Sequence, residues 1–164
     1  AHSDGPGHGS EFVLRLPLLP AETASSAPSR PGGDGVAPPE RPRRILVVDD
    51  YRDSADTLAR ILRQLGHEVQ PAYDGLSACE VAVAFTPDIV LLDIGLPGMD
   101  GYEVAMRLRV EPSLDGVYLV ALTGYGSESD RRKGEEAGFD AHLVKPVEFD
   151  ALHRALERTQ VVSS

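Results

Sequence analysis

The fold of this 164-residue chain is decided by the stretch Ile89-Val90-Leu91-Leu92-Asp93, four apolar residues that end in a carboxylate. Short runs of branched apolar residues bounded by turn residues are typical of buried strands in a parallel sheet. Three other stretches have the same form, and each also ends in a reactive residue. They are residues 45–48 before Asp49 and Asp50, residues 118–122 before Thr123, and residues 141–144 before Lys145 and Pro146.

Helical patterns separate these runs. Leu58, Ile61, Leu62 and Leu65 have the spacing of an amphipathic helix, and Gly66 is a typical helix end. Strand-like and helix-like patterns alternate five times, which predicts a parallel sheet covered by helices on both faces. We therefore expect an α/β fold, a doubly wound, flavodoxin-like (βα)5 sheet of five strands in the order 2-1-3-4-5. Four further helices are predicted over residues 75–85, 101–110, 127–137 and 148–159.

Composition divides the chain into three zones. Residues 1–20 combine glycines with a short apolar segment, whereas residues 21–42 are rich in Ala, Ser, Pro and Gly and predict a flexible linker. Residues 43–160 carry the dense Val, Leu, Ile and Ala content that a hydrophobic core requires. We expect a single folded domain over residues 43–160.

The overall charge restricts the partners of the chain. The formal net charge is −10, which argues against nucleic acid as the main partner and against direct contact with an anionic membrane surface. The single cysteine, Cys79, excludes an internal disulfide bond and fits a reducing compartment. We expect a cytoplasmic domain, and a membrane anchor elsewhere in a larger parent protein is compatible with this expectation.

The reactive residues at the strand ends are expected to meet at one edge of the sheet, because ligands of open α/β sheets bind outside the carboxyl ends of the strands. Asp49 and Asp50 are adjacent carboxylates that repel each other unless a cation or hydrogen-bond donors compensate. Helix capping is the alternative role for this pair. We favour a divalent cation such as Mg²⁺, which binds carboxylates, waters and phosphate oxygens.

Three more residues fit phosphoryl chemistry at that edge. Asp93 precedes a turn rich in Gly and Pro and is either a turn former or a nucleophile that forms an acyl phosphate. Thr123 is either an ordinary strand residue or a hydroxyl donor to a phosphoryl oxygen. Lys145 either extends to solvent or supplies a positive charge that pairs with Asp93 and with phosphate.

The motifs around these residues resemble, in order and spacing, the signature set of two-component response-regulator receiver domains. The resemblance covers residues 43 to about 160. It implies that Asp93 accepts a phosphoryl group from a phosphohistidine on a partner protein. The motifs are Val47-Val48-Asp49-Asp50, the stretch from Val90 through Asp93 to Glu103, Ala121-Leu122-Thr123-Gly124-Tyr125, and Leu143-Val144-Lys145-Pro146.

The resemblance also implies a metal site. Asp50 and Asp93 would bind Mg²⁺ (or Mn²⁺) directly, together with the backbone carbonyl of Gly95, and Asp49 would act through water. Thr123 and Lys145 would hold the phosphoryl oxygens. The Lys145–Pro146 peptide bond is typically cis in this family.

A conformational switch is implied as well. In the family, phosphorylation draws the residue at the position of Thr123 inward and frees space for a side chain on the fifth strand. That side chain is usually aromatic, and here it is His142. The alternative is that His142 is simply a partly exposed strand residue. An imidazole titrates near pH 6.5, so a switch that uses it would respond to pH.

The first zone carries a second resemblance. The glycine-rich segment that leads into Gly9-Ser10-Glu11-Phe12 and ends in Leu16-Pro17 is similar to the last hairpin of a histidine-kinase ATP-binding domain. This implies that residues 1–20 are a kinase remnant and that the chain comes from a hybrid sensor histidine kinase; a flexible tail is the alternative. An isolated apolar strand over residues 12–19 would also be an exposed edge, able to support a weak homodimer.

Two other functions share part of this residue set. A Mg²⁺-dependent phosphohydrolase with an aspartyl nucleophile often has a second acid two residues after the nucleophile, where this chain has Gly95. A phosphorylation-independent binding module is expected to lack one of the acidic, threonine or lysine positions, and all are present here. The receiver function is therefore preferred, with autophosphorylation and autodephosphorylation as the only activities of the fragment and a protein-histidine kinase as its parent.

Overall fold

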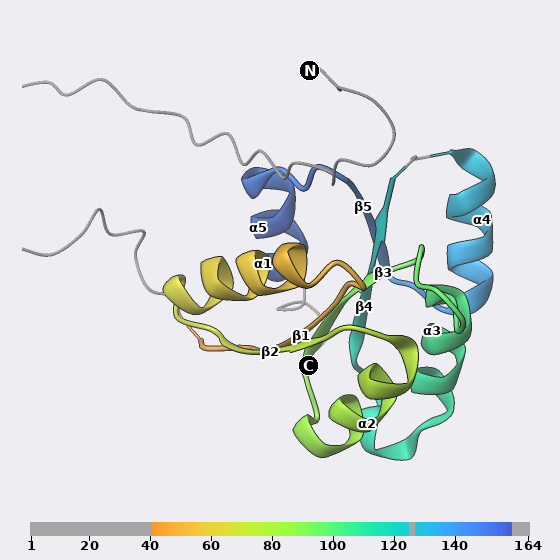
Figure 1. The fold of residues 1–164 in the computed structure, drawn as a ribbon, viewed down its shortest axis with the longest axis horizontal. Coiled ribbons are helices and arrows are strands. Elements are labelled where there is room, and N and C mark those ends of the chain that lie inside the picture. The colour runs from red at the N-terminus through yellow and green to blue at the C-terminus, as the bar shows by residue number, and fades with distance from the viewer. Residues whose placement is uncertain (1–40, 125–126, 159–164) are drawn as a thin grey trace, which may run out of the picture.

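The apolar runs form a five-stranded parallel sheet. The computed structural model describes residues 41–124 and 127–158. The strand order is β2-β1-β3-β4-β5, so the predicted doubly wound sheet and its order 2-1-3-4-5 are confirmed (Figure 1). The strands are β1 (Arg44–Val48), β2 (Glu68–Ala72), β3 (Ile89–Asp93), β4 (Tyr118–Thr123) and β5 (Ala141–Val144).

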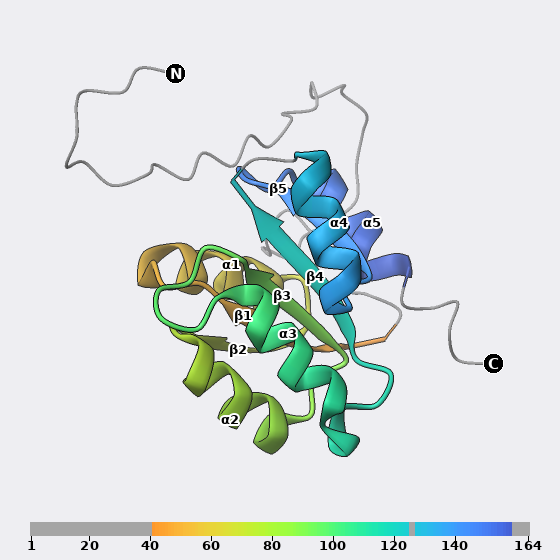
Figure 2. The same cartoon turned by 90° about the vertical axis from the view of Figure 1, so that its right-hand side faces the viewer.

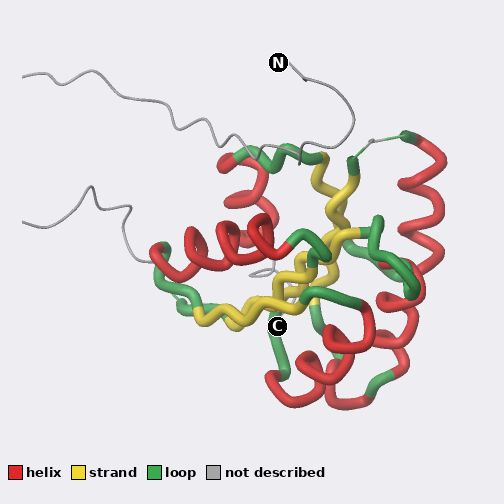
Figure 3. Tube along the Cα trace, viewed as in Figure 1, coloured by secondary structure: helices red, strands yellow, loops and turns green. Residues whose placement is uncertain are grey.

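Helices cover both faces of this sheet (Figures 1 and 3). Three of them begin at a side chain that accepts a hydrogen bond from the first turn, namely Asp74, Asp100 and Ser127. Gly66 and Gly138 follow helices with positive φ angles of 93° and 95°, a conformation that glycine adopts without strain. The helices are α1 (Arg52–Gln64), α2 (Gly75–Phe85), α3 (Gly101–Val110), α4 (Glu128–Ala137) and α5 (Phe149–Arg158), with a short 3₁₀ helix, η1 (Pro112–Leu114).

The core consists of two apolar layers, one on each face of the sheet. Alternate residues of a strand point to opposite faces, so β1, β2, β3 and β4 contribute to both layers, whereas the core residues of β5 lie in one of them. One layer joins the sheet to α1 and α5, and the other joins it to α2, α3 and α4. The central strands are therefore buried on both faces, which explains why β1 and β3 appear in the sequence as unbroken apolar runs.

Strand β2 is the one strand that no apolar run located in advance. It lies at the edge of the sheet and pairs with β1 alone. Its residues include exposed, half-buried and buried positions. It also contains Pro71, which has no backbone N–H group to donate to a second neighbouring strand. An edge position tolerates both features, so the pattern of this strand was weaker than that of the others.

Some predictions fall outside the described residues. The kinase remnant over residues 1–20, the apolar segment 12–19 with its homodimer, and residues 21–40 of the linker all lie there. Within the described part of the chain, no helix is both long and apolar enough to cross a lipid bilayer.

Arg109 joins the C-terminal half of α3 to the loops that precede β4 and β5. Its guanidinium group donates hydrogen bonds to the carbonyl oxygens of Val117, at 2.7 Å, and Gly138, at 2.6 and 2.8 Å. It also donates to the Asp140 carboxylate, which in turn accepts from the backbone N–H of Leu119. A single side chain therefore satisfies two backbone carbonyl groups and one carboxylate from two different loops.

We expect Arg109→Ala to lower the free energy of unfolding by about 2 kcal/mol, because charge-assisted hydrogen bonds to partly buried carbonyls are lost together. Urea denaturation followed by circular dichroism measures this change. Arg107→Ala removes the same charge from an exposed position of the same helix and is the matched control. Equal losses in the two variants would show that helix charge, and not the network of Arg109, produces the effect.

Candidate functional site

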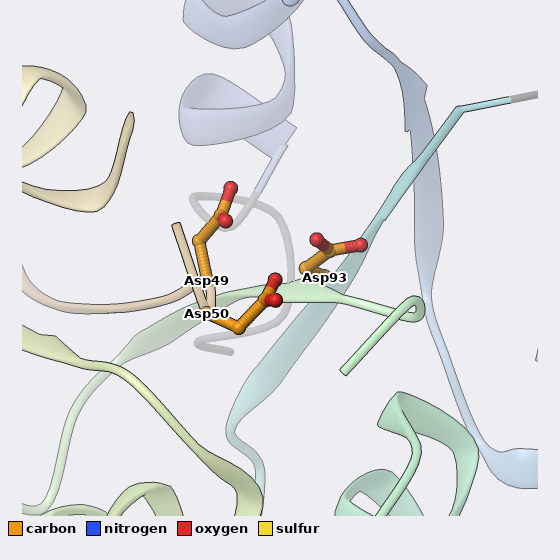
Figure 4. A group of neighbouring side chains, drawn as sticks. All are labelled: Asp49, Asp50 and Asp93. Atoms are coloured by element: carbon orange, nitrogen blue, oxygen red, sulfur yellow. The ribbon is translucent and has the colours of Figure 1, made fainter. Parts of the chain in front are cut away.

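Three carboxylates converge at the carboxyl end of the sheet. Asp49 and Asp50 follow β1, and Asp93 is the last residue of β3. Because β1 and β3 are parallel neighbours with Val48 paired to Leu92, their ends lie side by side. Each carboxylate places one oxygen within 4.8 Å of the others, as Figure 4 illustrates.

Asp49 and Asp50 occupy different environments although they are adjacent. Asp49 is only 2% exposed, and its oxygens accept hydrogen bonds from the backbone N–H of Tyr51, at 2.9 Å, and the hydroxyl of Ser54, at 3.0 Å. Asp50 is exposed. The first carboxylate is therefore anchored to the start of α1, whereas the second is available to a ligand in solvent.

Asp93 is held from two sides. Its Oδ1 accepts from the backbone N–H of Gly95, at 2.9 Å, and its Oδ2 accepts from the ammonium group of Lys145, at 2.7 Å. The residue is 9% exposed, so only a small part of the carboxylate is in contact with solvent. Gly101 at the start of α3 packs against the backbone of Asp93 so closely that a Cβ there would lie 2.5 Å from its carbonyl oxygen.

Lys145 bridges two of the three acids. Its Nζ atom lies 2.8 Å from Asp49 Oδ2 and 2.7 Å from Asp93 Oδ2. Burial by itself would lower the pKa of Lys145, but the hydrogen bonds and charges of the two carboxylates outweigh it and raise the pKa above its ordinary value. The ammonium group is therefore charged at any physiological pH. The Lys145–Pro146 peptide bond that follows is cis.

Thr123 ends β4 beside this group. The side chain is 2% exposed, and its hydroxyl has no hydrogen-bond partner among the described residues. A buried hydroxyl without a partner is costly and uncommon in folded proteins. The site therefore holds an unused donor next to the carboxylates.

His142 lies on β5, on the same face of the sheet as Thr123. Ala121 pairs with His142, and Thr123 is two residues further along β4. The side chains of Thr123 and His142 are therefore on adjacent strands, two residues (one step) apart along the strand direction. The imidazole is half-buried, and its ring lies 6.0 Å from the ring of Phe139. The Nε2 atom is buried without a partner among the described residues.

The structure brings the predicted residues Asp49, Asp50, Asp93 and Lys145 together at one edge of the sheet, but several of their contacts were not predicted. The sequence analysis paired Lys145 with Asp93 and did not foresee the equal contact with Asp49. The hydroxyl of Ser54 was also missed, because a serine in the first turn of a helix has no distinctive signal. The Gly95 N–H donor and the close approach of Gly101 depend on how the loop folds back, which no spacing reveals.

The charges of the site do not balance. Three carboxylates and one ammonium group leave two formal negative charges in a small volume. Repulsion between them costs stability unless a cation compensates. A hard divalent cation with oxygen ligands meets that need, and exposed Asp50 keeps the site open to it.

Comparison with known proteins agrees with this geometry. Residues 45–157 match the family described as response regulator receiver domain. The chain is 34% identical to the sensor histidine kinase AtsR of Burkholderia thailandensis, over 93% of this chain and 25% of that protein. It is 38% identical to the response regulator PleD of Caulobacter vibrioides, over 73% of this chain and 27% of PleD. The chain thus spans well under half of the length of these relatives.

Solved structures are similar as well. The chemotaxis protein CheY4 of Vibrio cholerae has a TM-score of 0.69 and 27% identity, and the alignment covers 73% of this chain and 99% of that one. The receiver domain of the sensor histidine kinase PA1611 of Pseudomonas aeruginosa, solved with a magnesium ion coordinated in its active-site cleft, has a TM-score of 0.66 and 31% identity, over 72% and 97% of the two chains. This chain therefore belongs to the family of response regulator receiver domains, the receiving modules of two-component phosphorelays.

Proposed function

We propose that Asp93 is the phosphoacceptor of this receiver domain. The observation that carries the proposal is the orientation of its carboxylate, which Gly95 and Lys145 hold at the open edge of the sheet beside two further acids. An oxygen of Asp93 attacks the phosphorus atom of a phosphohistidine. The new P–O bond forms as the P–N bond breaks, and the histidine nitrogen leaves with the electron pair and takes a proton from water.

The acidic cluster suits Mg²⁺ or Mn²⁺. Asp50 and Asp93 have oxygen atoms available to a metal, with the backbone carbonyl of Gly95 as a third protein ligand. Asp49 is already anchored by Tyr51, Ser54 and Lys145, which fits a role through water rather than direct ligation. A bound divalent cation neutralises the excess negative charge and the charge of the incoming phosphoryl group.

Thr123 and Lys145 are suited to the phosphorylated state. In the described part of the chain the buried hydroxyl of Thr123 has no partner, and a phosphoryl oxygen on Asp93 would provide one. Lys145 loses a carboxylate partner when Asp93 becomes an acyl phosphate but keeps its contact with Asp49. Its ammonium group therefore stays in place to bind the new phosphoryl oxygens.

The alternatives fit the site less well. A phosphohydrolase would need an acid that donates a proton to the leaving group, and Gly95 stands at the position where such enzymes carry it. A module that binds partners without phosphorylation would not need an acidic cluster, a charged lysine and a buried unpartnered hydroxyl together. Beryllofluoride, which mimics a phosphoryl group on aspartate, distinguishes the receiver from the phosphorylation-independent module: binding with Mg²⁺ supports the receiver, and absence of binding supports the module.

We further propose that the phosphodonor is a histidine-bearing protein and that the parent is a hybrid sensor histidine kinase with a kinase remnant over residues 1–20. The match to the sensor histidine kinase AtsR supports this origin, because it covers 93% of the chain and so extends beyond the receiver residues. In such a parent the receiver accepts phosphate from the kinase dimerisation domain or from a phosphotransfer protein, in the cytoplasm.

We expect Asp93→Asn to abolish phosphorylation by phosphohistidine donors, because an amide oxygen is too weak a nucleophile for phosphorus. Intact-protein mass spectrometry measures the addition of one phosphoryl group. The control is Asp115→Asn, which changes an exposed acid beyond η1, away from the carboxyl end of the sheet. If Asp93→Asn still gained phosphate at the rate of the unmodified chain, another residue would be the acceptor.

We expect Asp50→Asn to raise the Kd for Mg²⁺ roughly tenfold or more, since it removes one of the two charged ligands available to the metal. Isothermal titration calorimetry measures the Kd. Asp53→Asn removes an equal charge from the first turn of α1 and is the matched control for the general electrostatic effect. Similar Kd values for the two variants would exclude Asp50 as a ligand.

We also propose that Thr123 and His142 form the switch. They lie on one face of the sheet, one step apart along β4 and β5, so movement of Thr123 toward a phosphoryl group changes the space beside His142. Thr123 Oγ1 and His142 Nε2 are both buried without a hydrogen-bond partner among the described residues, which supports a rearrangement of these two side chains on phosphorylation.

For His142→Ala we expect metal binding close to that of the unmodified chain but a smaller change in the amide NMR spectrum of α4 and β5 on addition of beryllofluoride. The reason is that the side chain that transmits the movement of Thr123 has been removed. Chemical-shift mapping of both chains measures the change. An unchanged response in α4 and β5 would remove His142 from the switch.

A further inference from the structure

Helix α4 is attached to the rest of the domain by few apolar contacts. Of its ten residues, the buried ones are Gly134 and Ala137, and most of the others are charged and exposed. The helix lies beside α3 over the β4–β5 side of the sheet (Figure 2). A helix with so little buried apolar surface depends strongly on the quality of the contacts that it does make.

Gly134 is an unexpected residue inside this helix. Glycine is among the poorest helix formers, so a glycine in a helix interior usually has a packing reason. Here the reason is His142. A Cβ atom on Gly134 would overlap Nε2 of the His142 ring and come within 2.8 Å of Cε1. The missing side chain thus forms a notch in α4 that the imidazole fills, with the ring of Phe139 next to it.

The notch accepts an uncharged imidazole and disfavours a charged one. A protonated imidazole carries an N–H group on both nitrogens, and Nε2 is buried here with no acceptor among the described residues. Burial lowers the pKa of His142, and Arg131 lowers it further, while Glu135 and Asp130 oppose the shift. Opposite on β4 stands apolar Ala121.

The remaining neighbour of this group comes from α3. Tyr102 packs edge-on against the other side of Phe139, with 6.2 Å between ring centroids. Its hydroxyl is buried without a partner among the described residues, and burial raises its pKa, so it stays neutral. Among the described neighbours of His142, Glu135 and Asp130 of α4 are therefore the only groups that would stabilise a positive charge on the ring. Neither of these two carboxylates is hydrogen-bonded to the imidazole.

We propose that Gly134 is a positioning residue: because it has no side chain, the uncharged imidazole of His142 can pack against α4 and so connect this helix to β5. A proton on His142, or a methyl group at position 134, weakens this contact. The contact exists without any phosphoryl group and goes beyond the proposed phosphoryl transfer. Its consequence for signalling, through Thr123, rests on the proposed switch.

The direction of the pH effect follows from the lowered pKa. Above pH 6.5 the imidazole is neutral in both the folded and the unfolded chain, and the contact contributes its full stability. Below pH 6.5 the unfolded chain takes up a proton first, so stability falls as the pH drops toward the folded-state pKa. Acid therefore weakens the attachment of α4.

A double-mutant cycle tests the notch. In the unmodified chain, Gly134→Ala should lower the Tm by about 4 °C or more, because the new methyl group displaces the imidazole. In the His142→Ala background the same substitution should raise the Tm by about 4 °C, because alanine is a better helix former and no ring remains to clash. Tm changes of the same sign and size in both backgrounds would overturn the proposal.

NMR titration of the histidine ring protons provides the second readout. In Gly134→Ala the displaced imidazole enters water, and its pKa should rise toward 6.5. His67 is the internal control: its Nδ1 accepts from the backbone N–H of Arg43, at 3.2 Å, burial lowers its pKa, and it precedes β2 at the opposite edge of the sheet. Its titration should stay unchanged.

An unmoved pKa for His142 in Gly134→Ala would also overturn the proposal. Both measurements are made without metal or phosphodonor, so their failure leaves the phosphoacceptor role of Asp93 untouched. Conversely, a chain that does not accept phosphate can still show the expected cycle.

Discussion

The site depends on the ammonium group of Lys145, which lies between Asp49 and Asp93. It connects the ends of three segments that are far apart in the chain, at 2.8 and 2.7 Å from the two carboxylates. Without it, three carboxylates would face one another in a largely buried space with no positive charge to offset their repulsion. One ammonium group for three acids leaves the site negatively charged, and this residual charge makes it receptive to a metal ion.

The same arrangement separates the acids into two kinds. Asp49 and Asp93 are buried and hydrogen-bonded, whereas Asp50 is exposed. Groups already satisfied by backbone or lysine donors are held in fixed positions, and an exposed carboxylate can take a ligand at little cost in reorganisation. Thr123 adds a buried hydroxyl without a partner among the described residues. The site thus holds the nucleophilic carboxylate in a fixed position. It also offers a hydrogen-bond donor, the Thr123 hydroxyl, where a phosphoryl group would bind.

One face of the sheet links this site to α4. Thr123 and His142 lie one step apart on adjacent strands, and His142 fills the notch at Gly134. The helix that receives this ring buries little else, so its position is sensitive to a single contact. A small movement at the carboxyl end of β4 therefore has a short, contiguous route to the surface of the domain, through packed side chains rather than through a long network.

The sequence alone located four of the five strands, most helix boundaries and the set of residues at the sheet edge, because apolar runs, helix-end residues and reactive strand endings are local signals. The strand order was predicted from the fivefold alternation of strands and helices. The sequence did not locate β2, whose edge position allows exposed residues and Pro71. The sequence analysis singled out His142, but only the tertiary structure showed that Lys145 contacts two acids. It also showed that the absence of a side chain at Gly134 leaves room for the imidazole of His142. These contacts join residues whose separation in the sequence follows no helix or strand periodicity. They form only when the sheet and its helices pack together.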